Sequence, residues 1–192
     1  MRLVFIVVSV VLSGAVSALA QTASSDAVAQ KAALCARCHG SNGVPVSKDS
    51  PVISGQHAGY IFLELRDFKT GARKSPVMGP IASALTHEDM LALGEYFDKE
   101  PWPDLGQARA DEEYAPRAAA DIASGQCRQC HLGGFLGDSG TPRLAGQSID
   151  YLRATMSAFH DGTRGNNPWM AALLKTYSAQ DIDALARYLG GL

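Results

Sequence analysis

"CARCHG" at residues 35–40 and "CRQCHL" at residues 127–132 contain all four cysteines of this 192-residue chain. Each hexapeptide opens with Cys-x-x-Cys and follows it directly with histidine. On a helix, positions i, i+3 and i+4 share one face, so each copy presents two thiols and an imidazole in the same direction. Such a set can bond two vinyl groups as thioethers while the imidazole binds iron, which is the attachment signature of haem c. The sequence therefore predicts two covalently attached haems c.

The attachment residues follow from the two motifs. We expect thioether bonds from four cysteines and iron ligation by two histidines: Cys35, Cys38, Cys127 and Cys130, with His39 and His131. Other uses of the motif fit less well. A structural zinc site needs four ligands, whereas each copy supplies three and no further Cys or His recurs between the copies. A thioredoxin-like redox motif belongs to a βαβ unit, and two disulfides would leave both histidines without a role.

The first twenty residues predict export. "MRLVFIVVSVVLSGAVSALA" has a basic residue, an apolar run and a small-residue cleavage site, the pattern of a secretory signal peptide over residues 1–20. We therefore expect a periplasmic protein, with a retained membrane anchor as the alternative. Removing Arg2 from the 17 Lys and Arg residues leaves 16, against 19 Asp and Glu. These charges are interspersed, so nothing in the chain favours binding to nucleic acid.

The rest of the chain is an internal repeat. "PVISGQHAGYIFLELRDFKTGAR" from Pro51 aligns with "PRLAGQSIDYLRATMSAFHDGTR" from Pro142. Each copy reads as three helices and neither alternates like a strand, so we predict an all-α fold of two tandem domains. The predicted boundaries are a first domain over residues 21–98, a proline-rich linker over residues 99–116 and a second domain over residues 117–192.

Start and stop signals place the helices within each copy. The first helix leads into the cysteine motif, with Ser25 or Asp26 as a cap in the first copy. The second covers about 59–70 and 149–161 and ends near glycine. The third begins with a capping-box pattern at Thr86 and at Ser178, each followed three residues later by aspartate.

The repeat also selects a sixth iron ligand. Met78 follows His39 by the same interval as Met170 follows His131, so these methionines are the predicted second axial ligands. Residues without such a counterpart are assigned to the core or to local hydrogen bonds: Met90, Met156, His57, His87 and His160. Ligation by His and Met fills both axial positions, which favours electron transfer over catalysis at the iron.

Two further pairs of residues recur near the motifs. Pro51 and Pro142 each follow a motif histidine by about a dozen residues, and their carbonyls are suited to accept a hydrogen bond from its Nδ1 atom. The alternative is that these prolines only shape the loop. Arg73 and Arg164 recur just before the predicted methionine ligands; we weigh a role in pairing with haem propionates against ordinary surface exposure.

With these motifs the chain resembles the dihaem cytochromes c of the cytochrome c4 family. The resemblance rests on both hexapeptides, on "ISGQ" and "LAGQ", on "FKTGAR" and "FHDGTR", and on Met78 and Met170. It implies two class I cytochrome c domains joined by a linker, with periplasmic electron transfer between respiratory partners. One departure is Leu132, where the family usually has glycine and Gly40 fits, so we expect a different turn beside the second haem.

The implied partners are other redox proteins: a terminal oxidase, a bc1-type complex or a flavoprotein dehydrogenase, with membrane association only through them. The chain is then an electron carrier and not an enzyme. The alternative is the haem-bearing subunit of a flavocytochrome c-type sulfide dehydrogenase, whose active site lies on another chain. A dihaem peroxidase or thiosulfate dehydrogenase is less well supported, because it would need a haem without a matched methionine.

Overall fold

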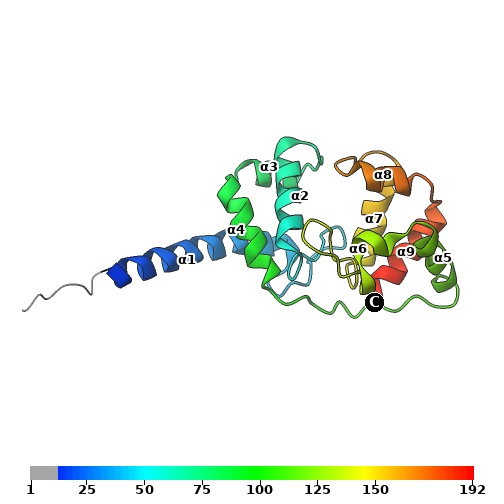
Figure 1. The fold of residues 1–192 in the computed structure, drawn as a ribbon, viewed down its shortest axis with the longest axis horizontal. Helices are drawn as coiled ribbons and strands as arrows, with labels where there is room; N and C mark the ends of the chain where they lie inside the picture. The colour runs from blue at the N-terminus through cyan, green and yellow to red at the C-terminus, as the bar shows by residue number, and fades with distance from the viewer. Residues whose placement is uncertain (1–12) are drawn as a thin grey trace, which may run out of the picture.

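The computed structural model describes residues 13–192, with side chains from residue 26 onward. Over that range the regular elements are all helices, joined by loops, and a single isolated bridge takes the place of any strand (Figure 1). The first half contains α1 (Ser13–His39), α2 (Ala58–Thr70), α3 (Met78–Ser83) and α4 (His87–Asp98). The second contains α5 (Ala115–Ser124), α6 (Cys127–His131), the 3-10 turn η1 (Gly133–Phe135), α7 (Ile149–His160), α8 (Pro168–Leu174) and α9 (Ala179–Gly190).

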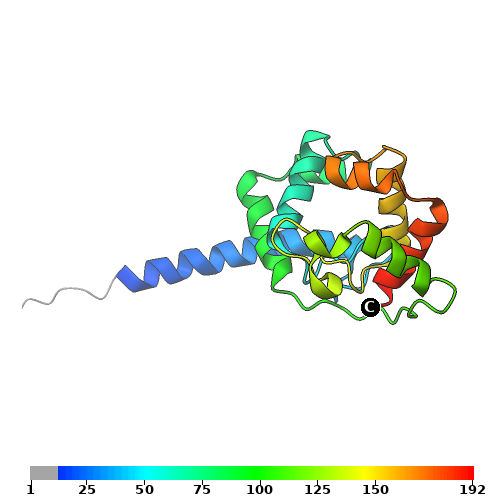
Figure 2. The same cartoon turned by 45° about the vertical axis from the view of Figure 1, so that its right-hand side comes forward.

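Each half of the chain has its own hydrophobic core. In the first, α2 packs on α4, and the end of α1 adds to a small cluster of Ala32, Ile61, Leu93 and Phe97. In the second, α5 and α7 pack on α9 around a larger cluster that includes Phe135. The two groups of helices stand side by side in both views (Figure 2). The predicted all-α fold of two tandem units is therefore confirmed.

The helix ends follow the local sequence signals. Thr86 and Ser178 each form a complete capping box, in which the hydroxyl accepts from the backbone N–H three residues on and that residue's carboxylate accepts in return. Ser148 caps α7 in the same way with its side chain alone. Gly71 ends α2 in the left-handed conformation at φ 78°, where glycine carries no Cβ penalty. These predicted ends are confirmed.

The start of the first helix was predicted wrongly. α1 is one continuous helix from Ser13, so neither Ser25 nor Asp26 acts as its cap. Its composition explains the difference, because the segment is rich in alanine and contains no glycine or proline after Gly14 to interrupt it. Of the predicted signal peptide, residues 1–12 lie outside the described residues. Within the described part, none of the helices combines the length and apolarity needed to cross a membrane.

The helix expected to lead into the second motif is broken in two. α5 ends at Ser124, and Gln126 adopts a left-handed conformation at φ 52° before α6 begins at Cys127. Next to this break, the Tyr177 hydroxyl donates to the Asp121 carbonyl oxygen at 3.0 Å, and the Gly125 N–H donates to the same oxygen. A Cβ added at Gly125 would lie 2.2 Å from that hydroxyl oxygen, so a larger residue there would have to displace the Tyr177 side chain.

The turns after the two motifs differ, as the sequence predicted. Gly40 has φ 85°, and a Cβ at this position would lie 1.9 Å from the Val44 carbonyl oxygen. In the second copy Leu132 adopts φ 61° and ψ 177°, a region occupied almost only by glycine, and η1 follows directly. The second turn is therefore strained at Leu132.

Replacing this leucine with glycine tests the strain. Leu132→Gly is expected to raise the free energy of unfolding by about 1 kcal/mol, because relief of ~1–3 kcal/mol of backbone strain exceeds the entropy cost of glycine. Thermal unfolding followed by circular dichroism would show a higher midpoint. The matched variant Gly40→Ala should lower it. A lower midpoint for Leu132→Gly would contradict the strain.

Candidate functional site

The two motif histidines are held alike by the backbone. His39 ends α1 and His131 ends α6, and both side chains are buried. Nδ1 of His39 lies 2.8 Å from the Pro51 carbonyl oxygen, and Nδ1 of His131 lies 3.0 Å from that of Pro142. A carbonyl can only accept, so Nδ1 carries the proton in each ring. The predicted role of the two prolines is confirmed.

This arrangement leaves the other ring nitrogen ready to bind a metal. Within the described part of the chain, the hydrogen bond of each ring is formed by Nδ1, and none is formed by Nε2 of His39 or of His131. Burial lowers the pKa of both histidines, and the proline carbonyls only partly oppose it. The neutral imidazole, which is the form that ligates metals, is therefore favoured at neutral pH.

The four motif cysteines are free thiols. Cys35 and Cys127 are half-buried, whereas Cys38 and Cys130 are exposed. Burial raises the pKa of Cys35 and of Cys127, so these groups are protonated at neutral pH. Two thiols beside an imidazole with a free Nε2, all within one helical turn, form the donor set that haem c requires. The residues present therefore fit the group.

The two predicted methionine ligands each lie in the first turn of a short helix. Met78 is the first residue of α3, and Met170 lies in the first turn of α8. The backbone N–H of each donates to a side chain three residues earlier, Ser75 Oγ at 3.0 Å and Asn167 Oδ1 at 3.2 Å. Both methionines are half-buried. Their role as iron ligands stays a prediction.

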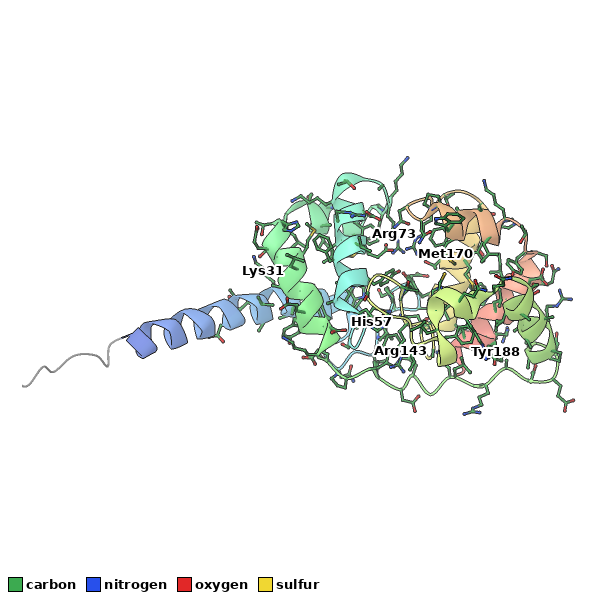
Figure 3. The ribbon with its side chains drawn as sticks, in the orientation of Figure 1. Lys31, His57, Arg73, Arg143, Met170 and Tyr188 are labelled. Atoms are coloured by element: carbon green, nitrogen blue, oxygen red, sulfur yellow. The ribbon has the colours of Figure 1, made fainter. Side chains whose placement is uncertain are left out.

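The residues set aside from ligation have local roles. Met90 and Met156 are buried in the two cores, as expected. The ring of His87 packs edge-on against Phe62, and His160 contacts the neighbouring Asp161. Nε2 of His57 lies 2.7 Å from the Leu136 carbonyl oxygen, which joins the first half of the chain to the second (Figure 3).

A buried charge cluster lies between the two halves. Glu64 of α2 accepts from Arg73 at 2.5 Å and from Arg164 at 2.5 Å, each bond using a different carboxylate oxygen. The three side chains are between 7% and 13% exposed. Burial alone would lower the pKa of Arg73, but Tyr151 and Glu64 hold it above its ordinary value. The Arg73 guanidinium is therefore charged in the interface.

The two arginines make matching contacts with both halves. Arg73 lies over the ring of Phe68 at 4.6 Å and donates to the Tyr151 hydroxyl at 3.1 Å. Arg164 lies over the ring of Phe159 at 4.4 Å and contacts the α2 carboxylate. Ordinary surface exposure, one of the two alternatives for these arginines, is therefore wrong. Glu64 could not be found from the repeat, because Thr155 occupies the equivalent position in the second copy.

Removing the central carboxylate tests how much the cluster contributes. Glu64→Gln is expected to lower the free energy of unfolding by about 3 kcal/mol, since it leaves two buried arginines without their counter-charge. Urea denaturation would measure the change. Glu95→Gln, on the exposed side of α4, is the matched control and should be neutral. An unchanged midpoint for Glu64→Gln would show that the arginines are compensated elsewhere.

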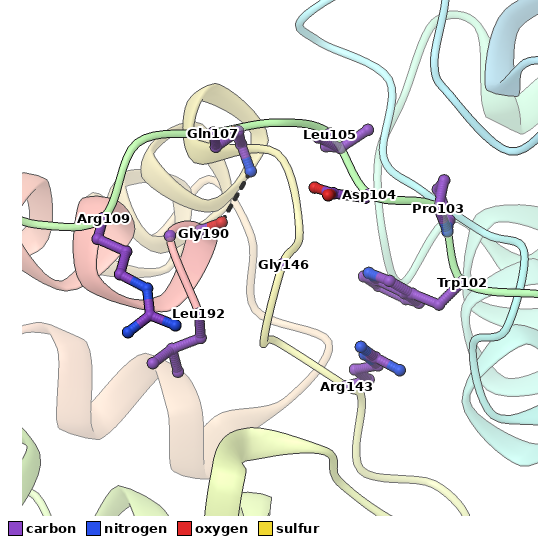
Figure 4. Close-up of a pocket in the computed structure, with 11 residues that line it drawn as sticks. Trp102, Pro103, Asp104, Leu105, Gln107, Arg109, Arg143, Gly146, Gly190 and Leu192 are labelled. Carbon is purple, nitrogen blue, oxygen red and sulfur yellow. Dashed lines mark hydrogen bonds between the residues drawn. The ribbon is translucent and has the colours of Figure 1, made fainter.

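The chain segment between α4 and α5 lies in a groove on the second half. Trp102 packs on Arg143, with the guanidinium 4.4 Å from the ring centroid. Further along, Gln107 donates to the carbonyl oxygens of Gln147 and Gly190, both at 2.9 Å. A pocket lies beside these contacts (Figure 4). Residues of this segment line much of the pocket, so we attribute the pocket to the packing of the segment against the second half.

Comparison with protein families gives an independent view of the chain. Residues 115–189 match the family described as "Cytochrome C oxidase, cbb3-type, subunit III". The thiosulfate dehydrogenase electron acceptor of Stutzerimonas stutzeri (strain A1501) is 35% identical, over 82% of this chain and 78% of its own. Cytochrome c4 of Thiocapsa roseopersicina is 32% identical, over 83% of this chain and 87% of its own.

A solved structure agrees with these relatives. Reduced recombinant cytochrome c4 from Pseudomonas stutzeri superposes with a TM-score of 0.76 at 26% identity. The match covers 87% of this chain and 97% of that structure. The similarity therefore extends over both groups of helices.

Proposed function

The chain belongs to the cytochrome c4 family of dihaem electron-transfer cytochromes, and from this premise we propose that it is a periplasmic carrier with two His/Met-ligated haems c. The observation that carries the proposal is the repeated histidine geometry. In each copy the imidazole is buried, its Nδ1 atom is oriented by a proline carbonyl, and its Nε2 atom is free beside two thiols.

We assign roles to the residues of each copy as follows. Cys35 and Cys38 would form the thioether bonds of the first haem, and His39 and Met78 would hold its iron. Cys127, Cys130, His131 and Met170 would do the same for the second. Bound haem supplies an iron that gains and loses one electron. Thioether sulfur favours Fe(II), so methionine raises the reduction potential, and two protein ligands leave no open position on the iron.

The proposed organisation is that of the sequence prediction. Residues 1–20 direct export, residues 21–98 and 117–192 form the two haem domains, and residues 99–116 link them. Export fits the chemistry of the motif, because four exposed or half-buried thiols become thioethers and no longer compete for disulfides. Fractionation of cells producing the full chain would test the periplasmic location.

We propose that the partners are redox proteins and that the chain itself is not an enzyme. A terminal oxidase and a bc1-type complex are the partners on the respiratory side. On the donor side, the 35% identical relative is named as an electron acceptor of thiosulfate dehydrogenase, which favours a dehydrogenase of an inorganic sulfur compound as the donor. Stopped-flow mixing of the reduced or oxidised protein with each purified partner would test this. If charge guides docking, the rate of electron transfer should fall as the salt concentration rises.

Substitution of the methionines tests the axial assignment. Met170→Ala is expected to lower the reduction potential of the second haem and leave the first unchanged, because removal of the thioether removes its preference for Fe(II). Redox titration followed by optical spectroscopy measures both haems. Met78→Ala should show the reverse pattern.

A core methionine provides the control. Met90→Leu should change neither potential, since Met90 lies in the first hydrophobic core. If Met170→Ala left the spectrum and potential of the second haem unchanged, another ligand would have to be sought. A purified protein without covalent haem absorption would end the proposal altogether.

A further inference from the structure

Two buried glutamines cross between the halves of the molecule in opposite directions. Gln56 follows Gly55 in the first copy and Gln147 follows Gly146 in the second, and both are 3% exposed. Nε2 of Gln147 donates to the Val52 carbonyl oxygen at 2.9 Å, and the Val52 N–H donates to Gln147 Oε1 at 2.8 Å. Gln56 pairs with Arg143 in the same way: its Nε2 donates to the Arg143 carbonyl oxygen at 3.0 Å, and the Arg143 N–H donates to its Oε1 at 2.9 Å. Each glutamine thus pairs with both backbone groups of a residue in the other half.

The peptide groups that receive these bonds also hold the motif histidines. The Val52 N–H belongs to the same peptide unit as the Pro51 carbonyl, which accepts from His39. A continuous chain therefore runs from Gln147 Oε1 through one peptide to His39 Nδ1. The reciprocal chain runs from Gln56 Oε1 through the Pro142–Arg143 peptide to His131 Nδ1.

Bonds arranged in this way reinforce one another. When a peptide N–H donates to a good acceptor, its carbonyl oxygen becomes more negative and accepts more strongly, an effect of about 10–30% per bond. A stronger bond at Nδ1 makes the imidazole a better electron donor at Nε2. The oxidised iron gains more from such a ligand than the reduced iron. A buried glutamine is well suited to this task, since its Oε1 accepts from the peptide N–H in place of a water molecule.

We propose that Gln147 is a positioning residue for His39 and Gln56 for His131, so that each domain adjusts the reduction potential of the haem held by the other. This rests on the proposed haem ligation by these histidines. The two units are therefore coupled in both directions through the ligands themselves.

The reciprocal variants Gln147→Met and Gln56→Met test the proposal in the full, haem-loaded chain. Methionine keeps the length and volume of the side chain but cannot form these bonds. Gln147→Met is expected to favour reduction of the first haem by about two- to tenfold in its equilibrium constant, up to ~59 mV for one electron. The second haem should not move. Gln56→Met should shift the second haem alone and in the same direction.

Redox titration with haem signals assigned by nuclear magnetic resonance separates the two potentials. Amide hydrogen exchange at Val52 reports independently whether the bond to Gln147 has been lost. His57→Ala is the control, because it removes a contact between the halves that does not touch either peptide. It should leave both potentials in place.

Several results would overturn the proposal. They are a shift in the haem of the same domain, equal shifts in both haems, a shift in the control, or faster exchange at Val52 with no change of potential. If Gln147→Met does not fold, Gln147→Asn, which shortens the reach by one methylene, tests the same prediction. Failure of the proposed function would look different: covalent haem or His/Met ligation would already be missing from the spectrum of the unaltered protein.

Discussion

The hydrogen bond from each motif histidine to a proline carbonyl determines how the rest of each unit is arranged. It requires the loop after the cysteine motif to return to the histidine within about a dozen residues. The same loop then continues into Gln56 in one copy and Gln147 in the other, and so reaches the boundary between the halves. The loop after each cysteine motif therefore both orients a buried histidine ring and joins its domain to the other one.

Polar contacts with partners on both sides cross the boundary between the halves. The two glutamines are satisfied by backbone groups, and the carboxylate of Glu64 is shared between two arginines. Buried polar groups cost free energy unless every one of them is paired, so few relative orientations of the domains are acceptable. Such an interface specifies one arrangement more strictly than an apolar surface would.

Much of this could be predicted from the repeat, because it compares each residue with a second copy under the same constraints. The all-α fold, the capping boxes, the proline carbonyls and the core methionines followed from recurrence and local chemistry. Features present in only one copy could not be found that way. Glu64 has no counterpart, and neither has the break at Gln126, since the first motif ends a continuous helix. The reciprocal glutamines were visible as a motif, but their partners lie across a boundary that the sequence does not show.

The passage of Trp102 between the halves shows why two copies of one unit cannot remain equivalent. A Cβ at Gly55 would lie 2.9 Å from the Trp102 backbone nitrogen, and one at Gly146 would lie 3.0 Å from its indole nitrogen. The glycine before each glutamine thus faces a different part of the same residue. A single connecting segment meets the two copies through different atoms, so joining the copies in one chain itself makes their surroundings unequal. Duplication followed by fusion would, on this geometry, distinguish the two halves before any further substitution did.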